Sequence, residues 1–209
     1  MSQEPFKKIE NLYTNSLNDY GANSQAVGWK TNESQMTRFD KLNSVIKDKS
    51  KIISINDYGC GYAAHLNQLV KNGYKVESYN GYDISEKMLS EAKIFLEKNK
   101  VNIKTNLLNS SDIITQADYT FVSGTFNVKF DIDENLWKEK IKEMLVKINQ
   151  FSNLGFSFNL LSTYVDWKEP HLFYGDPSYW FDFSKINFSK YVSLFHDYEL
   201  YEWTICVNK

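Results

Sequence analysis

Apolar positions along the chain alternate between two spacings, one typical of strands and one typical of helices. Short apolar runs predict strands, and apolar residues three or four positions apart predict the helices between them. The expected strands are Lys51–Ile55, Lys75–Tyr82, Val101–Asn106, Ala117–Ser123 and Gly155–Leu161. The expected helices are Ala63–Asn72, a helix capped by Ser85 that runs to about Glu97, and Glu134–Phe151. Regular alternation of this kind predicts a mostly parallel sheet with helices on both faces.

Two further runs, Tyr191–Phe195 and Leu200–Val207, predict a closing hairpin. Asp176–Pro177 predicts a turn before a short helix. The expected fold is therefore α/β: a doubly wound, mostly parallel seven-stranded sheet with a C-terminal antiparallel hairpin.

The first fifty residues precede this alternation. Ser34–Lys47 has the apolar spacing of a helix, whereas the polar stretch Asn15–Glu33 predicts irregular chain anchored by Tyr20 and Trp29. Because the alternating pattern is complete from Lys51 onward, we expect residues 1–50 to form a lid. Residues 51–209 would form the ligand-binding core of a single domain.

Composition narrows the class of protein. The chain has 209 residues, 42% of them apolar, and a net charge of −2, which gives no basic surplus for nucleic acid. It has no apolar run long enough to span a membrane, its first residues lack the pattern of a secretory signal, and it has two cysteines. We expect a reduced, cytoplasmic protein without a metal site, and the pattern leaves the oligomeric state open.

A glycine-rich stretch after the first expected strand, "NDYGCGYAAHL", indicates a nucleotide site. Gly59, Gly61 and Ala64 fit the dinucleotide pattern G-x-G-x-x-A, and Asp83 follows at the distance of a ribose-binding acid. Asp57 favours a different ligand, because a carboxylate at the strand end would repel a pyrophosphate. S-adenosylmethionine has no phosphate and carries two cationic groups.

Two motifs then carry a family resemblance. "SINDYGCGYAAHL" resembles the first motif of the class I S-adenosylmethionine-dependent methyltransferases, with Ala63 in place of the third glycine. "NGYDISEKML" resembles the second motif, an acid followed by a helix that opens S-x-x-M-L. The resemblance covers roughly Lys51 to the end of the chain. A nicotinamide-dependent oxidoreductase and a binding protein without turnover stay open as alternatives.

The resemblance implies S-adenosyl-L-methionine as the cofactor and assigns its contacts to the strand ends. They would come from Asp57, Gly59 and Gly61 at the methionine part; Asp83 at the ribose; Ile84, Met88, Asn106 and Leu107 at the adenine; and Ser123, Gly124 and Phe126 beside the donor methyl. The alternative interpretation is a tight turn at the glycines and a helix-capping charge at Asp83.

Two charged or titratable residues suggest further roles. Arg38 is the only arginine in a lysine-rich chain, which suggests a need for bidentate geometry and hence the cofactor carboxylate as a target. His196, next to Asp197, is a candidate general base if its strand runs parallel to the sheet. The alternatives are a surface arginine and an ordinary turn histidine. We expect His65 to be packed or exposed and not catalytic.

The methyl acceptor is the least constrained part. "GDPSYWF" is similar to the D-P-P-Y motif of base methyltransferases but follows the fifth strand and not the fourth. We therefore expect a small-molecule acceptor with an oxygen or nitrogen nucleophile, and no nucleic acid or membrane partner. A nucleic-acid or protein acceptor is the alternative. The wall of the site for the small-molecule acceptor would come from aromatic-rich segments. Its expected residues are Tyr20, Trp29, Tyr164, His171, Tyr174 and Trp180.

Overall fold

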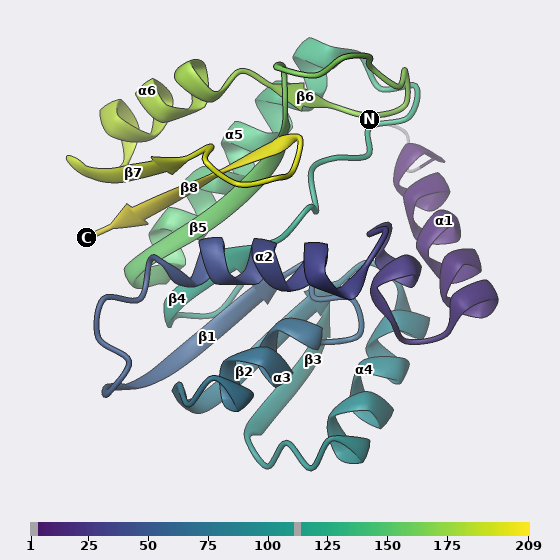
Figure 1. Cartoon of the computed structure of the whole chain (residues 1–209), viewed down its shortest axis with the longest axis vertical. Helices are drawn as coiled ribbons and strands as arrows, with labels where there is room; N and C mark the ends of the chain where they lie inside the picture. The colour runs from purple at the N-terminus through teal and green to yellow at the C-terminus, as the bar shows by residue number, and fades with distance from the viewer. Residues whose placement is uncertain (1–3, 111–113) are drawn as a thin grey trace.

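The computed structural model describes residues 4–110 and 114–209 and has a single mixed sheet at its centre (Figure 1). The sheet order is β3-β2-β1-β4-β5-β8-β7, with the two-residue strand β6 paired to β5. The strands are β1 Ile52–Tyr58, β2 Lys75–Asp83, β3 Lys104–Asn109, β4 Ala117–Val122, β5 Ser152–Ser162, β6 Tyr174–Gly175, β7 Tyr191–Phe195 and β8 Glu202–Asn208. All pairings are parallel except those of β8 with β5 and β7. The expected α/β fold is confirmed.

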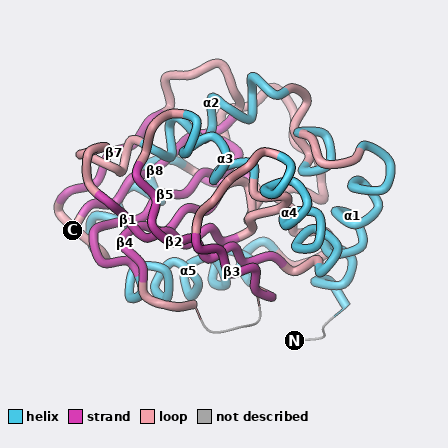
Figure 2. The backbone as a smooth tube through the Cα atoms, turned by 90° about the horizontal axis from the view of Figure 1, so that it is seen from below, coloured by secondary structure: helices cyan, strands magenta, loops and turns pink. Residues whose placement is uncertain are grey.

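Helices cover both faces of the sheet, and Figure 2 shows α3 and α5 on opposite sides of the strands. The helices are α1 Glu4–Tyr20, the 3-10 helix η1 Ser24–Val27, α2 Asn32–Asn43, α3 Ala64–Lys71, α4 Glu86–Lys98, α5 Glu134–Phe151 and α6 Pro177–Asn187. One core contains buried apolar side chains of α2, α3 and α4, and the other contains those of α5 and α6. In the described ranges, no helix has the length and apolar character needed to cross a membrane.

The strand order places a crossover between β1 and β4. From β1 the chain passes outward to β2 and β3, then returns to add β4 on the other side of β1. In parallel sheets a ligand binds beyond the carboxyl ends of the strands at such a switch point. The fold therefore directs attention to the residues that follow β1, β2 and β4.

The expectation of irregular chain before residue 33 is wrong for its first part. The helix α1 continues to Tyr20, and its buried Ile9 and Leu17 flank Tyr13 at a spacing of four residues. A single stripe of this kind, in an otherwise polar segment, buries enough surface to hold the helix against α4 and η1.

The expected third strand is displaced. It begins at Lys104 and not at Val101, because Lys100 adopts a left-handed φ of 55° and the Val101 N–H donates back to Leu96. Residues 101–103, which were expected to begin the strand, form the connection between α4 and β3. The carboxyl end of β3 is therefore Asn109, paired with Asp83, and not Asn106.

A buried ion pair joins α2 to β8. The Nε of Arg38 lies 2.8 Å and 2.9 Å from the two carboxylate oxygens of Glu202, and both side chains are buried. The Arg38 guanidinium also donates to the Ser34 carbonyl. Burial raises the pKa of Glu202, and the guanidinium beside it opposes that rise. Each charge thus depends on the other for its stability inside the protein.

We predict that Arg38→Ala lowers the free energy of unfolding by about 3–5 kcal/mol, because it leaves the Glu202 carboxylate buried without a counter-charge. Urea unfolding followed by circular dichroism measures the change. The control is Lys41→Ala, which breaks the exposed Lys41–Asp197 pair and should change the stability little. Equal losses for both variants would contradict the prediction.

Candidate functional site

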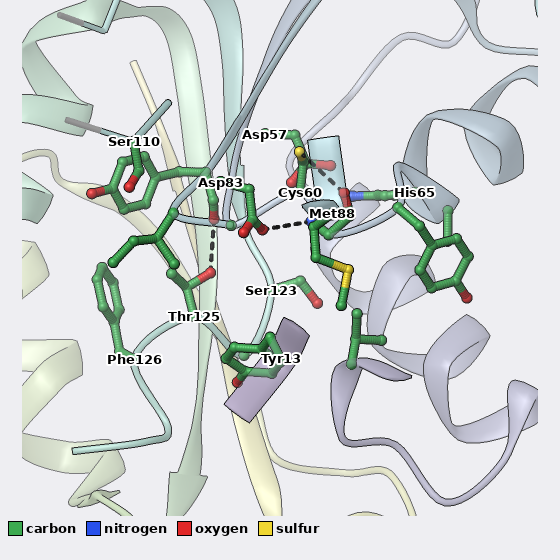
Figure 3. A pocket seen from close by; sticks show the side chains of 18 of the residues that line it. Tyr13, Asp57, Cys60, His65, Asp83, Met88, Ser110, Ser123, Thr125 and Phe126 are labelled. Atoms are coloured by element: carbon green, nitrogen blue, oxygen red, sulfur yellow. Dashed lines mark hydrogen bonds between the residues drawn. The ribbon is translucent and has the colours of Figure 1, made fainter. Parts of the chain in front are cut away.

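A pocket lies at the carboxyl edge of the sheet, beyond β1, β2 and β4 (Figure 3). It encloses about 1060 Å³ of space, including its open mouth, which is of the size of small-molecule sites. The described residues that line it are Phe6, Ile9, Tyr13, Val27, Trp29, Gln35, Phe39, Asp57, Tyr58, Gly59, Cys60, Gly61, Tyr62, Ala64, His65, Asp83, Ile84, Met88, Ser110, Ser123, Gly124, Thr125, Phe126 and Trp137.

The loop from Gly59 to Ala63 forms the floor between β1 and α3. The N–H groups of Gly59 and Cys60 both donate to the Tyr82 carbonyl, at 2.7 and 2.9 Å, which ties the loop to β2. Gly59 has a φ of 82°, and a Cβ there would lie 2.1 Å from the Thr125 hydroxyl oxygen. Only glycine fits this position. Ala63 accepts a left-handed φ of 61° just before α3.

Two buried carboxylates share the pocket. The Tyr79 hydroxyl donates to Asp57 at 2.8 Å, and the N–H groups of Gly61 and Ser85 donate to Asp83 at 2.9 Å. Burial raises the pKa of Asp57 to about 7 and outweighs the Tyr79 hydrogen bond. Burial also raises the pKa of Asp83, against its backbone hydrogen bonds.

The charge of the pocket is one-sided. Among the described residues that line it there is no lysine or arginine. Its one histidine is His65, whose pKa is lowered to about 3 by burial, so the ring is neutral near pH 7. A ligand with positive charge would supply the counter-charge that the described lining lacks.

The N-terminal segment forms one wall of the pocket. Ile9 and Tyr13 come from α1, and Trp29 comes from the loop between η1 and α2. The Trp29 ring lies against Gly124, where a Cβ would be 2.5 Å from the ring, and the Arg38 guanidinium carbon lies 3.7 Å from the ring centroid. Trp29 is therefore fixed between the end of β4 and the buried ion pair.

The chain after β4 is tied at two of three consecutive positions. The Gly124 N–H donates to Asn159 at 2.7 Å, and the Thr125 hydroxyl donates to the Tyr58 carbonyl at 2.7 Å. The Ser123 hydroxyl, which also lines the pocket, is buried and has no hydrogen-bond partner in the described part of the chain. It is thus a polar atom, at a fixed place, that a ligand could satisfy.

Most of the expected cofactor contacts come together in this pocket. Nine of the residues expected from the sequence line it: Asp57, Gly59, Gly61, Asp83, Ile84, Met88, Ser123, Gly124 and Phe126. Of the expected acceptor contacts, Trp29 lines it as well.

Three expected cofactor residues lie outside the pocket lining. Asn106 and Leu107 are within β3, three and two residues from its end; the Asn106 amide donates to Asn80, and Leu107 packs on the core. Ser110, after the true end of the strand, lines the pocket instead. The guanidinium of Arg38 is held by Glu202, so its contacts do not support binding of a ligand carboxylate.

The remaining expected acceptor residues and the candidate base also lie outside the lining. Trp180 is buried on the α6 side against Phe158 and Phe173. His196 follows a strand parallel to β5, as expected, but β7 is at the far edge of the sheet, where the exposed imidazole packs against Tyr164. Tyr20 is 52% exposed at the end of α1. The His171 carbonyl accepts from the N–H groups of Lys129 and Phe130, and the Tyr174 hydroxyl accepts from the Glu169 N–H.

Several lining residues were not expected from the sequence. Phe6 and Ile9 belong to the first half of α1, for which no element was expected from the sequence, and Trp137 is an inward residue of α5. Their apolar periodicity was visible, but periodicity reports burial and does not say which buried residues border a cavity.

Comparison with known proteins places this geometry in a family. No protein-family model matches the chain. The protein Rv1506c of Mycobacterium tuberculosis, which is named as a methyltransferase, is 40% identical over 158 residues, covering 75% of this chain and 93% of that protein. TehB of Haemophilus influenzae, named as an S-adenosyl-L-methionine-dependent methyltransferase, is 29% identical over 119 residues, which is 56% of this chain and 38% of TehB.

Solved structures with the same fold act on different acceptors. The magnesium protoporphyrin IX methyltransferase of Synechocystis, solved with bound S-adenosylmethionine, has a TM-score of 0.66 at 14% identity and covers 100% of this chain and 98% of its own. The small RNA methyltransferase HEN1 has a TM-score of 0.60 at 14% identity, over 84% of this chain and 25% of its own. These two comparisons establish the fold. Together with the 40% identical relative, they show that the chain belongs to the class I S-adenosylmethionine-dependent methyltransferases.

Proposed function

We propose that the protein transfers a methyl group from S-adenosylmethionine to an oxygen or nitrogen atom of a small, partly apolar acceptor. The observation that carries the donor assignment is the pair of buried carboxylates, Asp57 and Asp83, in a pocket whose described lining has no basic side chain. Family membership supports the same assignment.

The residues fit the donor along the ends of three strands. Asp57 and the glycine loop would hold the amino-acid part, since a carboxylate attracts its ammonium. Asp83 has two oxygens and would accept from both ribose hydroxyls. Ile84 and Met88 would pack on the adenine. When bound, the donor supplies a methyl group that is already activated by the sulfonium.

The chain's own contribution to the reaction is then positioning. The end of β4 is held by Asn159 and by the Thr125–Tyr58 hydrogen bond, which fixes Ser123 and Gly124. The free Ser123 hydroxyl would orient the acceptor nucleophile, and Trp29 and Phe126 would restrict its approach and exclude water. In-line geometry at the methyl group would follow from this fixed frame.

The shape of the pocket supports a small acceptor. Phe6, Ile9, Tyr13 and Trp29 cover it from the N-terminal side, and residues 1–50 would thus serve as a lid. A second cavity shares Phe6, Tyr58 and Trp137 with the first and continues along α5. Lys140 and Lys147 line the second cavity. In the first pocket, Trp29 and Phe126 stand beside the β4 end and the described lining has no basic side chain, which suits stacking on a small ligand more than a phosphate chain.

We predict that the protein binds S-adenosylhomocysteine and does not bind NAD or NADP. The reason is that Asp57 and Asp83 attract an ammonium and repel a pyrophosphate in a poorly screened pocket. Isothermal titration calorimetry with each ligand measures this. Micromolar binding of NAD with no heat from S-adenosylhomocysteine would reject the proposed donor.

Binding of S-adenosylhomocysteine is expected to strengthen as pH rises through about 7. Below its pKa of about 7 Asp57 is mostly protonated and cannot attract the ligand ammonium; above it the anion predominates. The dissociation constant at pH 6 should be about tenfold higher than at pH 8.

The ionisation of Asp57 has the opposite effect on the stability of the free protein. Because folding raises the pKa of Asp57 above its ordinary value of about 3.8, its contribution to stability is present at low pH and is lost as pH rises through about 7.

The control for the pH dependence of binding is Asp57→Asn. This variant should bind S-adenosylhomocysteine weakly, with a dissociation constant that changes little between pH 6 and pH 8. A profile that keeps the wild-type slope in Asp57→Asn would assign the titration to another group.

The acceptor class is tested by offering the protein three kinds of methyl acceptor in separate reactions. Purified protein is incubated with methyl-labelled S-adenosylmethionine and either a metabolite extract below about 1 kDa, total RNA or unfolded protein. We expect label in the small-molecule fraction, and Trp29→Ala should reduce that transfer while S-adenosylhomocysteine binding is retained. Label transferred mainly to RNA or protein would reject the small-molecule acceptor.

A further inference from the structure

His65 is buried beside the glycine loop and has one ring nitrogen without a partner. It is 2% exposed, lies in the first turn of α3 and lines the pocket. Its ring stacks on Phe39 with centroids 4.4 Å apart and meets Phe121 edge-on at 4.5 Å. These two contacts fix the plane of the ring, and its nitrogens are left for polar contacts.

A chain of hydrogen bonds determines which nitrogen carries the proton. The Gln68 amide nitrogen lies 2.8 Å from Asp40 Oδ1 and 3.4 Å from the Met36 carbonyl oxygen, both of which can only accept while Asp40 is ionised. The Gln68 oxygen therefore faces Asn43, whose Nδ2 donates to it at 3.2 Å.

The direction of the chain continues to His65. With Nδ2 used, Asn43 presents its oxygen, which lies 2.8 Å from His65 Nε2. Nε2 must then be the protonated nitrogen, and Nδ1 carries a lone pair. Nδ1 is buried and has no hydrogen-bond partner within residues 4–110 and 114–209. Burial lowers the pKa of His65 to about 3, so a proton does not occupy this lone pair near pH 7.

His65 lies close to the part of the sheet that contains Asp57. Phe121, on which the imidazole packs, is the residue of β4 paired with Asp57 of β1. Figure 3 shows His65 and Asp57 among the side chains of the same pocket. Asp57 of β1 and His65 of α3 thus line the same pocket, and each has a hydrogen-bond acceptor in its side chain.

We propose that Nδ1 of His65 accepts a hydrogen bond from the ammonium of the methyl donor and so acts with Asp57 to recognise its amino-acid end. An ammonium has three N–H donors, which matches several acceptors converging on one point. A bound carboxylate or phosphate would find no donor at this atom. The inference rests on the proposed donor, but the protonation state of His65 can be measured without any ligand.

The first experiment is nitrogen NMR on protein labelled with ¹⁵N-histidine. The free protein should show His65 as the neutral tautomer protonated at Nε2 from pH 5 to 8, and S-adenosylhomocysteine should shift the Nδ1 resonance in the direction of hydrogen bonding. A tautomer protonated at Nδ1, or an Nδ1 resonance that S-adenosylhomocysteine binding leaves unchanged, would overturn the inference.

The second experiment compares two ligands by calorimetry. Methylthioadenosine shares the nucleoside and sulfur of S-adenosylhomocysteine but lacks the amino-acid part. His65→Phe keeps a ring to stack on Phe39 and removes the acceptor, so it should weaken S-adenosylhomocysteine about 10- to 100-fold and methylthioadenosine much less. His65→Asn, which can present an oxygen near the Nδ1 position, should recover part of the loss.

The outcomes separate the two proposals. Equal losses for both ligands in His65→Phe would overturn the role of His65 and leave the donor assignment intact. Failure of the wild-type protein to bind S-adenosylhomocysteine would overturn the donor assignment itself. Circular dichroism of each variant confirms that the fold is kept; if His65→Phe does not fold, the His65→Asn titration and the NMR shift decide.

Discussion

The burial of two carboxylates in one pocket is the constraint on which the site depends. An ionised group away from water needs a counter-charge, hydrogen bonds or a raised pKa. Asp57 and Asp83 have hydrogen bonds and raised pKa values, but the described lining supplies no cation. In the proposed function, a cationic ligand would relieve this electrostatic imbalance, so the same two carboxylates would contribute to the binding energy and to the choice of ligand.

The sheet makes this arrangement possible. Asp57 and Asp83 end adjacent parallel strands, so the backbone brings together two like charges that a flexible loop would let separate. The loop after β1 is then held by two N–H groups on the Tyr82 carbonyl, and the close approach of Thr125 leaves room only for glycine at position 59. The strand ends and the tied loop thus hold the polar atoms of the pocket in place.

The sequence predicted those parts of the fold that depend on local pattern. The helix Glu134–Phe151 has the bounds that its apolar spacing indicated, and the glycine motifs identified most of the pocket floor. The expected start of the third strand was wrong because Val101 and Ile103 are apolar and pack on the core, but belong to the irregular connection before β3. Local patterns thus indicate burial, even where the predicted start of a strand is wrong.

Contacts between distant segments could not be predicted in this way. Arg38 was expected to bind a ligand because nothing in its neighbourhood reveals Glu202 as the partner. The aromatic segment after β5 was expected to wall the acceptor site, yet Trp180 packs into the core formed by α5 and α6. Aromatic density indicates that a surface will be buried, and the topology decides whether a ligand or the protein buries it.

The Arg38–Glu202 contact has a consequence for how the pocket is assembled during synthesis. The two residues are 164 positions apart in the sequence, and Arg38 also holds the Trp29 ring in place. Until β8 has left the ribosome and joined the sheet, Arg38 lacks its Glu202 counter-charge, and Trp29 lacks a fixed guanidinium over its ring. Contacts of such long range form slowly because a large loop must close first. The contact of Arg38 that holds Trp29 is therefore completed later than the glycine loop, whose hydrogen bonds to Tyr82 span a short stretch of the chain.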